Sequence, residues 1–202
     1  MFESKTEKLV LGFLCSHSGS NMQAIINNIL SGKIDAKVGA VISNNSTSGA
    51  MQKAKAQNIP AFHVSEKEYN SRVDETIIKI FKQHNVNLII LAGYMKKVSQ
   101  ELIKAFNGRV LNIHPALLPK YGGRGMYGIR VHQAVIEAGD KISGATVHLV
   151  DANYDQGRIL LQRQVDVLHN DTAEVLASRV LEIEHIIYSE VINKISSGEI
   201  KI

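Results

Sequence analysis

The sequence contains a single cysteine and no tryptophan. A lone cysteine cannot form a disulfide within its own chain, which is typical of proteins in a reducing compartment, so we expect a cytoplasmic protein. Cys15 stands in an apolar run, where we expect a buried small side chain rather than a nucleophile. No apolar stretch reaches the roughly 18 residues that a membrane-spanning helix needs, and the charged first residues do not resemble a secretory signal. These absences argue against a disulfide-rich secreted domain and against a membrane protein.

Prolines, aromatic residues and excess charge are also scarce. The three prolines, Pro60, Pro115 and Pro119, all stand between expected helices and strands. The chain has no repeat and no linker, and its length suffices for a substantial core, so residues 1–202 are expected to form one domain. The net charge of +4 is spread along the chain and aromatic residues make up only 5%, which argues against a nucleic-acid partner. The same mild charge is compatible with small anionic substrates.

What is present is an alternation of apolar runs and amphipathic segments. The expected strands cover residues 9–15, 37–42, 61–64, 87–92 and 109–113. The expected helices between them cover residues 20–31, 48–57, 66–84 and 99–106. This order predicts an α/β fold, a Rossmann-like and mostly parallel sheet with helices on both faces. Residues 87–92 are apolar at consecutive positions, which favours a central strand buried on both sides.

The second half of the chain has a different pattern. A helix is expected over residues 131–137, and residues 145–150 and 159–167 alternate like antiparallel strands. A long final helix is expected to begin at Asp171 or Thr172, either of which can cap it. Its expected core stripe includes Val175, Val180, Ile183, Ile187 and Val191. The fold should therefore end in an antiparallel C-terminal portion.

The most informative motif, Asn112-Ile113-His114-Pro115, ends the last of the parallel strands. Side chains two apart on a strand point the same way, so Asn112 and His114 can share one face. An amide donor beside an imidazole can stabilise an oxyanion and move protons at neutral pH. Taken alone, the pair could also merely bond loop backbone. In α/β sheets ligands bind at the carboxyl ends of the strands, and this motif lies at such an end.

A turn rich in glycine and serine follows the first strand, in Ser18-Gly19-Ser20-Asn21. Backbone N–H groups at the start of a helix attract anions, so the turn can bind a phosphate. An ordinary strand-to-helix turn with Ser20 as cap fits equally well. Gly93, after the central strand, would let a ligand approach the backbone, although a simple turn explains it too.

The polar loop between the last two strands holds two candidate carboxylates, Asp151 and Asp155. A carboxylate folded over His114 would raise the pKa of the imidazole, but spacing alone does not choose between the two. His132 and His185 are expected to be structural, while His148 can face either the cleft or solvent. No spacing of histidine, cysteine and acidic residues matches a zinc site, so no metal is expected.

Together these segments resemble the phosphoribosylglycinamide formyltransferase family. The resemblance rests on Ser18-Gly19-Ser20-Asn21-Met22-Gln23, Leu91-Ala92-Gly93-Tyr94-Met95, Asn112-Ile113-His114-Pro115-Ala116-Leu117-Leu118-Pro119, Val147-His148-Leu149-Val150 with Asp155-Gln156-Gly157, and Glu182-Ile183-Glu184-His185. It covers nearly the whole chain in order. The long Asn-x-His-Pro motif marks the formyltransferase superfamily, and the Gly-Ser-Asn near the start narrows it to this family.

The resemblance implies roles for particular residues. The catalytic residues would be Asn112, His114 and Asp155; the phosphate and glycinamide contacts Gly19, Ser20, Asn21 and Glu184; and the folate contacts Met95, Lys96, Lys97, Val98 and Asn112. His17 stands where the family often has glycine, and Lys96 where many members have arginine, which removes bidentate reach toward a carboxylate. An arginine common after the third strand has no clear match in residues 65–68. Residues 121–130 are longer than the common form, and their four glycines suggest a mobile flap.

The implied reaction moves a formyl group from the co-substrate 10-formyltetrahydrofolate to the amine of glycinamide ribonucleotide, in de novo purine biosynthesis and without a metal. Asn112 and a positively charged His114 would stabilise the oxyanion, and Asp155 would keep His114 charged and relay a proton. The partners would be these two small molecules, with no nucleic acid and no membrane, and the protein would be a monomer or a homodimer.

Three other functions compete with formyl transfer to the ribonucleotide. The nearest is 10-formyltetrahydrofolate hydrolase, which normally carries a further N-terminal domain, whereas the first strand here is expected at residue 9. Methionyl-tRNA formyltransferase would need a C-terminal domain and a basic surface. A non-catalytic nucleotide-binding module would not require Asn112, His114 and Asp155 together.

Overall fold

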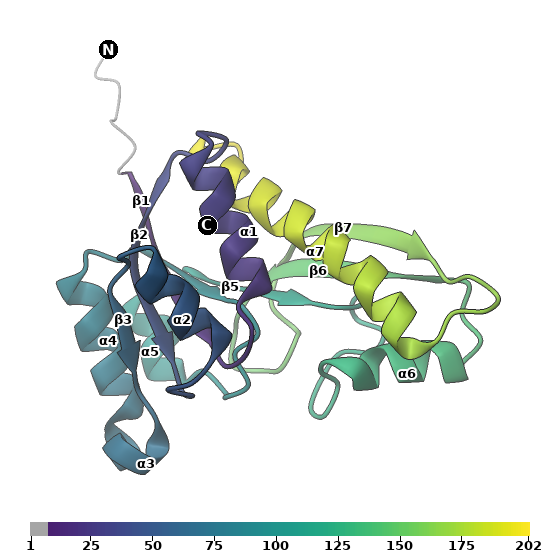
Figure 1. Cartoon of the computed structure of the whole chain (residues 1–202), viewed down its shortest axis with the longest axis horizontal. Helices are drawn as coiled ribbons and strands as arrows, with labels where there is room; N and C mark the ends of the chain where they lie inside the picture. The colour runs from purple at the N-terminus through teal and green to yellow at the C-terminus, as the bar shows by residue number, and fades with distance from the viewer. Residues whose placement is uncertain (1–7) are drawn as a thin grey trace.

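The computed structural model describes residues 8–202 and centres on a sheet with the strand order β3-β2-β1-β4-β5-β6-β7 (Figure 1). Strands β1 to β5 are parallel to one another and span Leu9–Cys15, Ala36–Ser43, Ala61–His63, Leu88–Leu91 and Val110–His114. Strands β6 (Ile142–Leu149) and β7 (Ile159–Asp166) continue the sheet in antiparallel order. The α/β fold expected from the sequence, with its antiparallel C-terminal portion, is confirmed.

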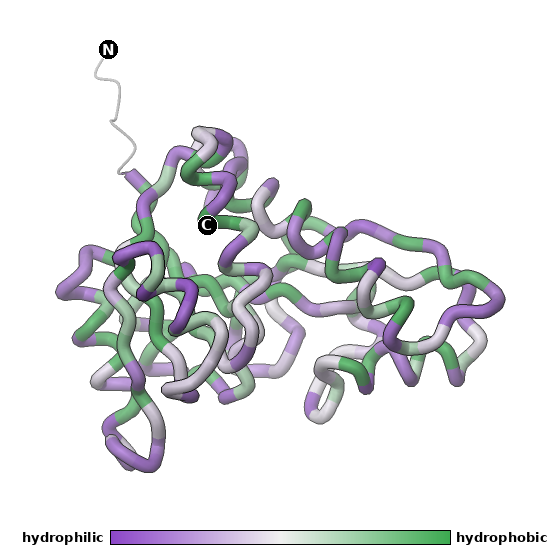
Figure 2. Tube along the Cα trace, in the orientation of Figure 1, coloured by the Kyte–Doolittle hydropathy of each residue, from purple (hydrophilic) through white to green (hydrophobic). Residues whose placement is uncertain are grey.

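Helices cover both faces of the sheet. They are α1 (Ser20–Leu30), α2 (Gly49–Ala56), α3 (Glu66–Tyr69), α4 (Val73–Gln83), α5 (Gln100–Ala105), α6 (Ile129–Glu137) and α7 (Ala173–Ser196), with the 3-10 turn η1 (Asn70–Arg72) between α3 and α4. One apolar core joins the sheet to α1, α2, α6 and α7, and a second joins its other face to α4 and α5. Apolar positions follow the central strands, and hydrophilic positions recur along the helices (Figure 2).

The strand order places the candidate site residues at the carboxyl ends of the central strands. The chain moves outward from β1 to β3 and then returns to β4 on the other side of β1. Ligands bind in such sheets where the order reverses, at the carboxyl ends of the strands. β4 is buried along its whole length between two parallel neighbours, as its continuous apolar run predicts. The segments that follow β1, β4 and β5 therefore meet at these carboxyl ends.

Two local predictions are wrong. The helix expected over residues 66–84 is interrupted, because Asn70 adopts a φ of 49° and separates α3 from η1 and α4. An amphipathic pattern does not reveal such a break, since a positive φ at one exposed asparagine leaves the apolar stripe undisturbed. Val175 does not belong to the core of α7, because 48% of its surface is exposed in the first turn of that helix.

The predictions for Thr172 and Cys15 are confirmed. Thr172, one of the two expected caps, is the N-cap of α7 and accepts a hydrogen bond from the amide of Val175. Cys15 is fully buried, which raises the pKa of its thiol to about 12 and leaves the thiol protonated. Within residues 8–202 no helix is both long enough and apolar enough to cross a membrane.

Candidate active site

Strands β5 and β6 bring the central side chains of the site together. Asn112 and His114 come from β5, and in the antiparallel register they lie opposite His148 and Thr146 of β6. The loop after β6 returns Asp155 to the carboxyl end of β5, with its carboxylate 3.6 Å from Nδ1 of His114 and 3.6 Å from Nε2 of His148. Asp151 is exposed, and its carboxylate accepts the amide of Asn153 within its own loop. Of the two carboxylates left open by the sequence, Asp155 is the one that faces His114.

His114 is buried and well oriented. Its Nε2 lies 2.7 Å from the backbone carbonyl oxygen of Tyr121, and because a carbonyl only accepts, Nε2 carries the proton. Nδ1 then holds the lone pair in the neutral ring and faces Asp155 across a gap longer than a direct hydrogen bond. The imidazole can therefore take up a proton at Nδ1.

The burial of His114 changes the pKa of its imidazole. Burial lowers the pKa of His114 below its ordinary value, and the opposing effects of Asp155 and the Tyr121 carbonyl do not restore it. Asp155 raises the pKa of His114, as expected, but by less than burial lowers it, and a charged His114 during the reaction stays a prediction. The sequence predicts a carboxylate near the ring, but it does not predict how deeply the two groups are buried.

Asp155 is ionised in this environment. Burial alone would raise the pKa of its carboxyl, but the polar contact with His148, the adjacent imidazole of His114 and the backbone N–H of Gly123 together lower it. The Gly123 amide donates to Oδ2 of Asp155 at 2.9 Å. Asp155 itself has a φ of 57°, a conformation that aspartate and asparagine tolerate better than most residues.

Sequence reasoning left His148 undecided, and the structure places it inside the site. Its Nδ1 lies 2.8 Å from the carbonyl oxygen of Leu149 and must donate there, so Nε2 of the neutral ring accepts from the amide nitrogen of Asn112 at 3.1 Å. An amide –NH₂ has two hydrogens, so Asn112 keeps one for a ligand. The strand pattern around His148 predicted a β-strand, but only the pairing register shows that this histidine lies opposite Asn112.

Asn112, His114 and Asp155 line a cleft of about 660 Å³. Its other walls come from the segments after β1 and β4, from α7, and from the glycine-rich segment 123–128. The lining residues are His17, Asn21, Gly93, Tyr94, Met95, Lys96, Asn112, Ile113, His114, Pro115, Gly123, Arg124, Gly125, Met126, Tyr127, Gly128, Arg130, Tyr154, Asp155 and Glu184. Residues 123–128 thus form one wall of the cleft, whereas the flap motion expected of them stays a prediction.

Asn21 and Glu184, far apart in the sequence, form a buried pair in the wall of this cleft. The amide nitrogen of Asn21 donates to Oε2 of Glu184 at 2.7 Å, while Oδ1 of Asn21 has no hydrogen-bond partner among residues 8–202. Burial raises the pKa of the Glu184 carboxyl to about 7, against a smaller opposing effect of the Asn21 hydrogen bond. A buried acceptor and a carboxyl that ionises near neutrality are suited to bind a polar ligand.

Glu184→Gln is expected to change stability in a pH-dependent way. The folded protein binds the Glu184 proton more tightly than the unfolded chain, so ionisation destabilises the fold as the pH rises from 4.5 through about 7. Glutamine cannot ionise, so relative to wild type the variant should gain up to about 3 kcal/mol between pH 5 and pH 8. Urea unfolding at both pH values measures this. The control is Glu182→Gln on the exposed side of α7, and an equal effect of Glu184→Gln at both pH values would contradict the argument.

The predicted phosphate residues lie at the start of α1. Gly19 is the N-cap of this helix, with a φ of 68°, and Ser20 begins it without a side-chain cap. Asn21 lines the cleft, whereas Gly19 and Ser20 lie beside it, so the turn meets the cleft at its helical end. Ser20 is not the capping residue that the alternative interpretation of this turn required.

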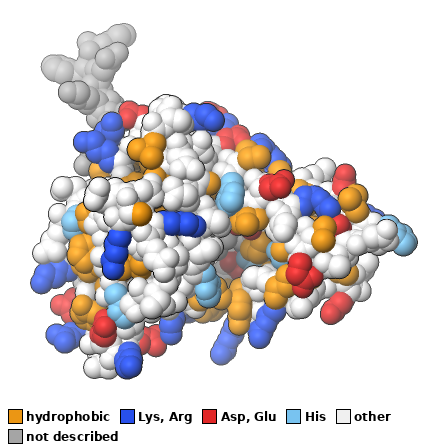
Figure 3. Space-filling view, viewed as in Figure 1, with side chains coloured by type: hydrophobic (Ala, Val, Ile, Leu, Met, Phe, Trp, Pro, Cys, Tyr) orange, Lys and Arg blue, Asp and Glu red, His pale blue; other side chains and the backbone are white. Residues whose placement is uncertain are grey.

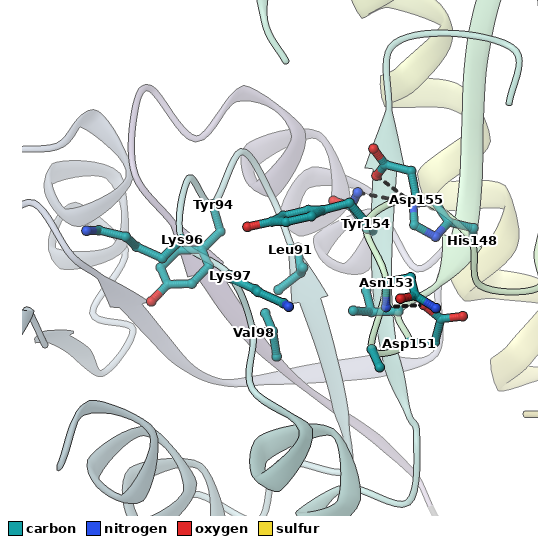
Figure 4. A pocket seen from close by; sticks show the side chains of 13 residues that line it. Leu91, Tyr94, Lys96, Lys97, Val98, His148, Asp151, Asn153, Tyr154 and Asp155 are labelled. Carbon is teal, nitrogen blue, oxygen red and sulfur yellow. Dashed lines mark hydrogen bonds and ion pairs between the residues drawn. The ribbon is translucent and has the colours of Figure 1, made fainter. Parts of the chain in front are cut away.

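The predicted folate segment, residues 95–98, lines the cleft and a smaller cavity beside Asn112. Met95 and Lys96 line the main cleft, and Lys96, Lys97 and Val98 line a smaller cavity of about 90 Å³ that Asn112 and His148 also border. Figure 4 shows the Tyr154 ring reaching from loop 151–155 toward Tyr94. The amine of Lys97 lies 5.5 Å from the centre of that ring. Lys96 forms an ion pair with Glu66 at 3.2 Å, an exposed contact of small energy.

The remaining observations concern charge and metals. Acidic and basic side chains are interspersed over the face drawn in Figure 3 rather than gathered by sign. Among residues 8–202 no cluster of three or more histidine, cysteine or acidic side chains could hold a metal ion. That no metal takes part stays a prediction.

Comparison with known proteins places this geometry in a family. Residues 9–192 match the formyl transferase family. The chain is 40% identical to the chloroplastic phosphoribosylglycinamide formyltransferase of Arabidopsis thaliana over 202 residues, covering 98% of this chain and 68% of that protein. It is 38% identical to the phosphoribosylglycinamide formyltransferase of Haemophilus influenzae over 194 residues, covering 95% and 89% of the two chains. The chain belongs to the formyl transferase family, and the resemblance drawn from its motifs is confirmed.

Solved structures agree with this assignment. Glycinamide ribonucleotide transformylase 1 from Symbiobacterium toebii superposes with a TM-score of 0.90 at 37% identity, covering 96% of this chain and 91% of that one. A formyltetrahydrofolate deformylase from Pseudomonas syringae has a TM-score of 0.87 at only 21% identity, and this chain covers 64% of it. That second likeness shows the fold alone.

Proposed function

We propose that this chain transfers the formyl group of 10-formyltetrahydrofolate to the amine of glycinamide ribonucleotide, a step of de novo purine biosynthesis. The observation that carries the proposal is the convergence of Asn112, His114 and Asp155 at a cleft with two different sides. One side holds the start of α1 and the Asn21–Glu184 pair, and the other holds residues 95–98. Two sides flanking one reacting centre suit a reaction between two substrates.

In the proposed reaction the neutral amine of the ribonucleotide attacks the formyl carbon of the folate. The carbonyl oxygen becomes an oxyanion, the bond from carbon to N10 of the folate breaks, and a proton passes from the attacking amine to N10. Asn112 donates its free amide hydrogen to the oxyanion, and the loss of one such donor typically costs about 2.7–4 kcal/mol of barrier.

His114 and Asp155 handle the proton in this scheme. Because burial lowers the pKa of His114, the imidazole first acts as an acceptor at Nδ1, and the carboxylate of Asp155 stabilises the imidazolium that results. A water or substrate group that contacts both Nδ1 and the carboxylate, which lie 3.6 Å apart, can carry a shared proton between them. His148 orients Asn112 and contacts the other oxygen of Asp155, so it aligns both ends of the catalytic set.

Each substrate is assigned to one side of the cleft. The phosphate of the ribonucleotide binds at the Gly19-Ser20-Asn21 turn, where the start of α1 presents backbone N–H groups, and Glu184 binds the polar remainder of the ribonucleotide. The folate binds along Met95, Lys96, Lys97, Val98 and Asn112. We further propose a cytoplasmic monomer or homodimer that needs no metal, nucleic acid or membrane.

Gly19→Ala is expected to weaken binding of the ribonucleotide more than binding of the folate. A Cβ on Gly19 would lie 2.8 Å from Cβ of Ala50, and a φ of 68° strains any residue with a side chain, so the turn must shift. The control is Gly32→Ala at the far end of α1, where φ is 76° and no atom lies within 4 Å of the added group. Calorimetric titration of each variant with each substrate tests the assignment. An equal loss for both substrates would remove the phosphate role of this turn.

The function is tested by following deformylation of the folate with and without glycinamide ribonucleotide. A transferase must exclude water from the formyl carbon until the amine is bound, so turnover should depend strongly on the ribonucleotide. The walls formed by residues 123–128 and 151–155 can provide this exclusion. Deformylation at a comparable rate without the ribonucleotide would favour 10-formyltetrahydrofolate hydrolase, the alternative.

A further inference from the structure

Tyr121 has an unusual backbone conformation beside the catalytic histidine. Its φ is 57°, in the left-handed region that a bulky residue rarely adopts, and its carbonyl oxygen lies 2.7 Å from Nε2 of His114. Strained backbone of this kind persists only where the surroundings hold it, and it concentrates at functional sites. The conformation of Tyr121 turns its carbonyl back toward the end of β5.

The side chain of Tyr121 anchors the residue through contacts with Asp140 and Lys120. Its hydroxyl donates a hydrogen bond to Oδ2 of Asp140 at 2.9 Å, just beyond the end of α6. Lys120 donates to the same oxygen at 2.5 Å, and its amine lies 4.9 Å from the centre of the Tyr121 ring. The residue is thus anchored through its hydroxyl, while its carbonyl points to the site.

The chain just before Tyr121 is fixed by hydrogen bonds around one buried threonine. Thr146, the strand partner of His114, is fully buried, and its hydroxyl donates to the carbonyl of Ala116 at 2.6 Å. The same hydroxyl accepts from the amide of Leu118 at 3.1 Å and from the side chain of Gln162 at 2.9 Å. Residues 116–118 are therefore tied to β6 and β7, and Tyr121 is held between these hydrogen bonds and Asp140.

We propose that Tyr121 is a positioning residue for His114: its anchored backbone carbonyl fixes the proton on Nε2 and so presents Nδ1 to Asp155. The catalytic consequence rests on the proposed function, whereas the effect on the imidazole does not. Without the carbonyl, the proton could move to Nδ1, and the ring would lose the lone pair that takes up the reaction's proton. The titratable groups that face or influence His114 are Asp155, His148 of β6 and His132 of α6.

The test removes the anchor without removing the carbonyl. Tyr121→Phe and Asp140→Ala each break the contact between the hydroxyl and the carboxylate, from opposite ends, whereas Asp140→Asn keeps an oxygen acceptor. Tyr69→Phe on α3 is the control for loss of a tyrosine hydroxyl elsewhere. The readouts are kcat, KM, the pH profile of kcat, and ¹⁵N chemical shifts of the histidine ring nitrogens in the full chain without substrates.

We expect the wild-type spectrum to show His114 protonated at Nε2 and unprotonated at Nδ1. In Tyr121→Phe and Asp140→Ala the two nitrogen shifts should move toward each other, as the tautomers mix. kcat should fall roughly tenfold with KM changed less than about twofold, because only the orientation of the proton acceptor changes. The acid limb of the profile should move to lower pH, because the lost N–H···O=C bond favours the protonated ring. Asp140→Asn and Tyr69→Phe should resemble wild type.

Unchanged nitrogen shifts and an unchanged pH profile in both anchor variants, with only a lower melting temperature, would overturn the proposal. If Tyr121→Phe does not fold, Asp140→Ala decides by the same readouts. If the protein proves to have another activity, the ring-nitrogen shifts still decide the role of Tyr121, since they need no substrate. A failure of the positioning role is thereby distinguished from a failure of the proposed function.

Discussion

His114→Ala is expected to lower kcat about a thousandfold or more while leaving ribonucleotide binding nearly intact. The substitution removes the group that accepts a proton at Nδ1, and positioned acid–base groups typically contribute about a hundredfold to ten-thousandfold. It also leaves the carbonyl of Tyr121 without its donor and the charge of Asp155 without its partner. The side of the cleft around Asn21 and Glu184, to which the ribonucleotide is assigned in our proposal, is formed by α1 and α7 and should be unaffected. Stopped assays for kcat and calorimetry for ribonucleotide binding measure the two effects separately.

His169→Ala is the matched control, because His169 is exposed in the turn before α7. It should keep wild-type kcat. A His114→Ala variant that binds the ribonucleotide and retains activity within a few-fold of wild type would contradict the catalytic role. A variant that loses binding and stability together would instead show a structural defect, which circular dichroism and thermal unfolding detect.

Asp155→Asn is expected to lower kcat about a hundredfold, and Asp151→Asn less than about twofold. Asparagine keeps an oxygen acceptor for the amide of Gly123 and tolerates the φ of 57° at this position, so the loop should keep its shape. What it loses is the negative charge that stabilises the imidazolium of His114. Asp151 lies in the same loop, but its carboxylate is exposed and accepts only the amide of Asn153. Steady-state kinetics of the two variants side by side provide the measurement.

The same two variants also distinguish an effect of the Asp155 charge from an effect of the loop conformation. If Asp151→Asn proves the more damaging, the catalytic carboxylate has been assigned to the wrong residue. If both are equally damaging, the loop contributes through its conformation rather than through the charge of Asp155. Only a large loss confined to Asp155→Asn supports the proton-transfer role.

Much of the fold could be predicted from the sequence because the strands carry periodic signals. The apolar run of β4 predicts a strand buried on both faces, and the alternation in β6 and β7 predicts antiparallel strands. Asn112 and His114 could be singled out because they end β5 at the edge where α/β sheets bind ligands. Their roles, like those of Asp155, Glu184 and the folate segment, stay predictions, as does a single domain over residues 1–202.

What could not be predicted depends on register, burial and backbone conformation. His148 lies opposite Asn112 through strand pairing, and an alternating pattern does not contain the register. The lowered pKa of His114 follows from its burial, which outweighs the effect of a carboxylate 3.6 Å away. The contact from Tyr121 comes from a backbone carbonyl, so its side-chain identity gives no signal. The positive φ at Asn70 and the exposure of Val175 likewise leave the helical periodicity unchanged.

The most direct measurement follows the formyl carbon itself. The protein is mixed with 10-formyltetrahydrofolate labelled with ¹³C in the formyl group and with glycinamide ribonucleotide, and the products are observed by ¹³C NMR. The label should appear on the amine of the ribonucleotide as an N-formyl group, with little free formate, and should stay on the folate when the ribonucleotide is omitted. Label that accumulates as formate at the same rate with and without the ribonucleotide would contradict formyl transfer by this protein.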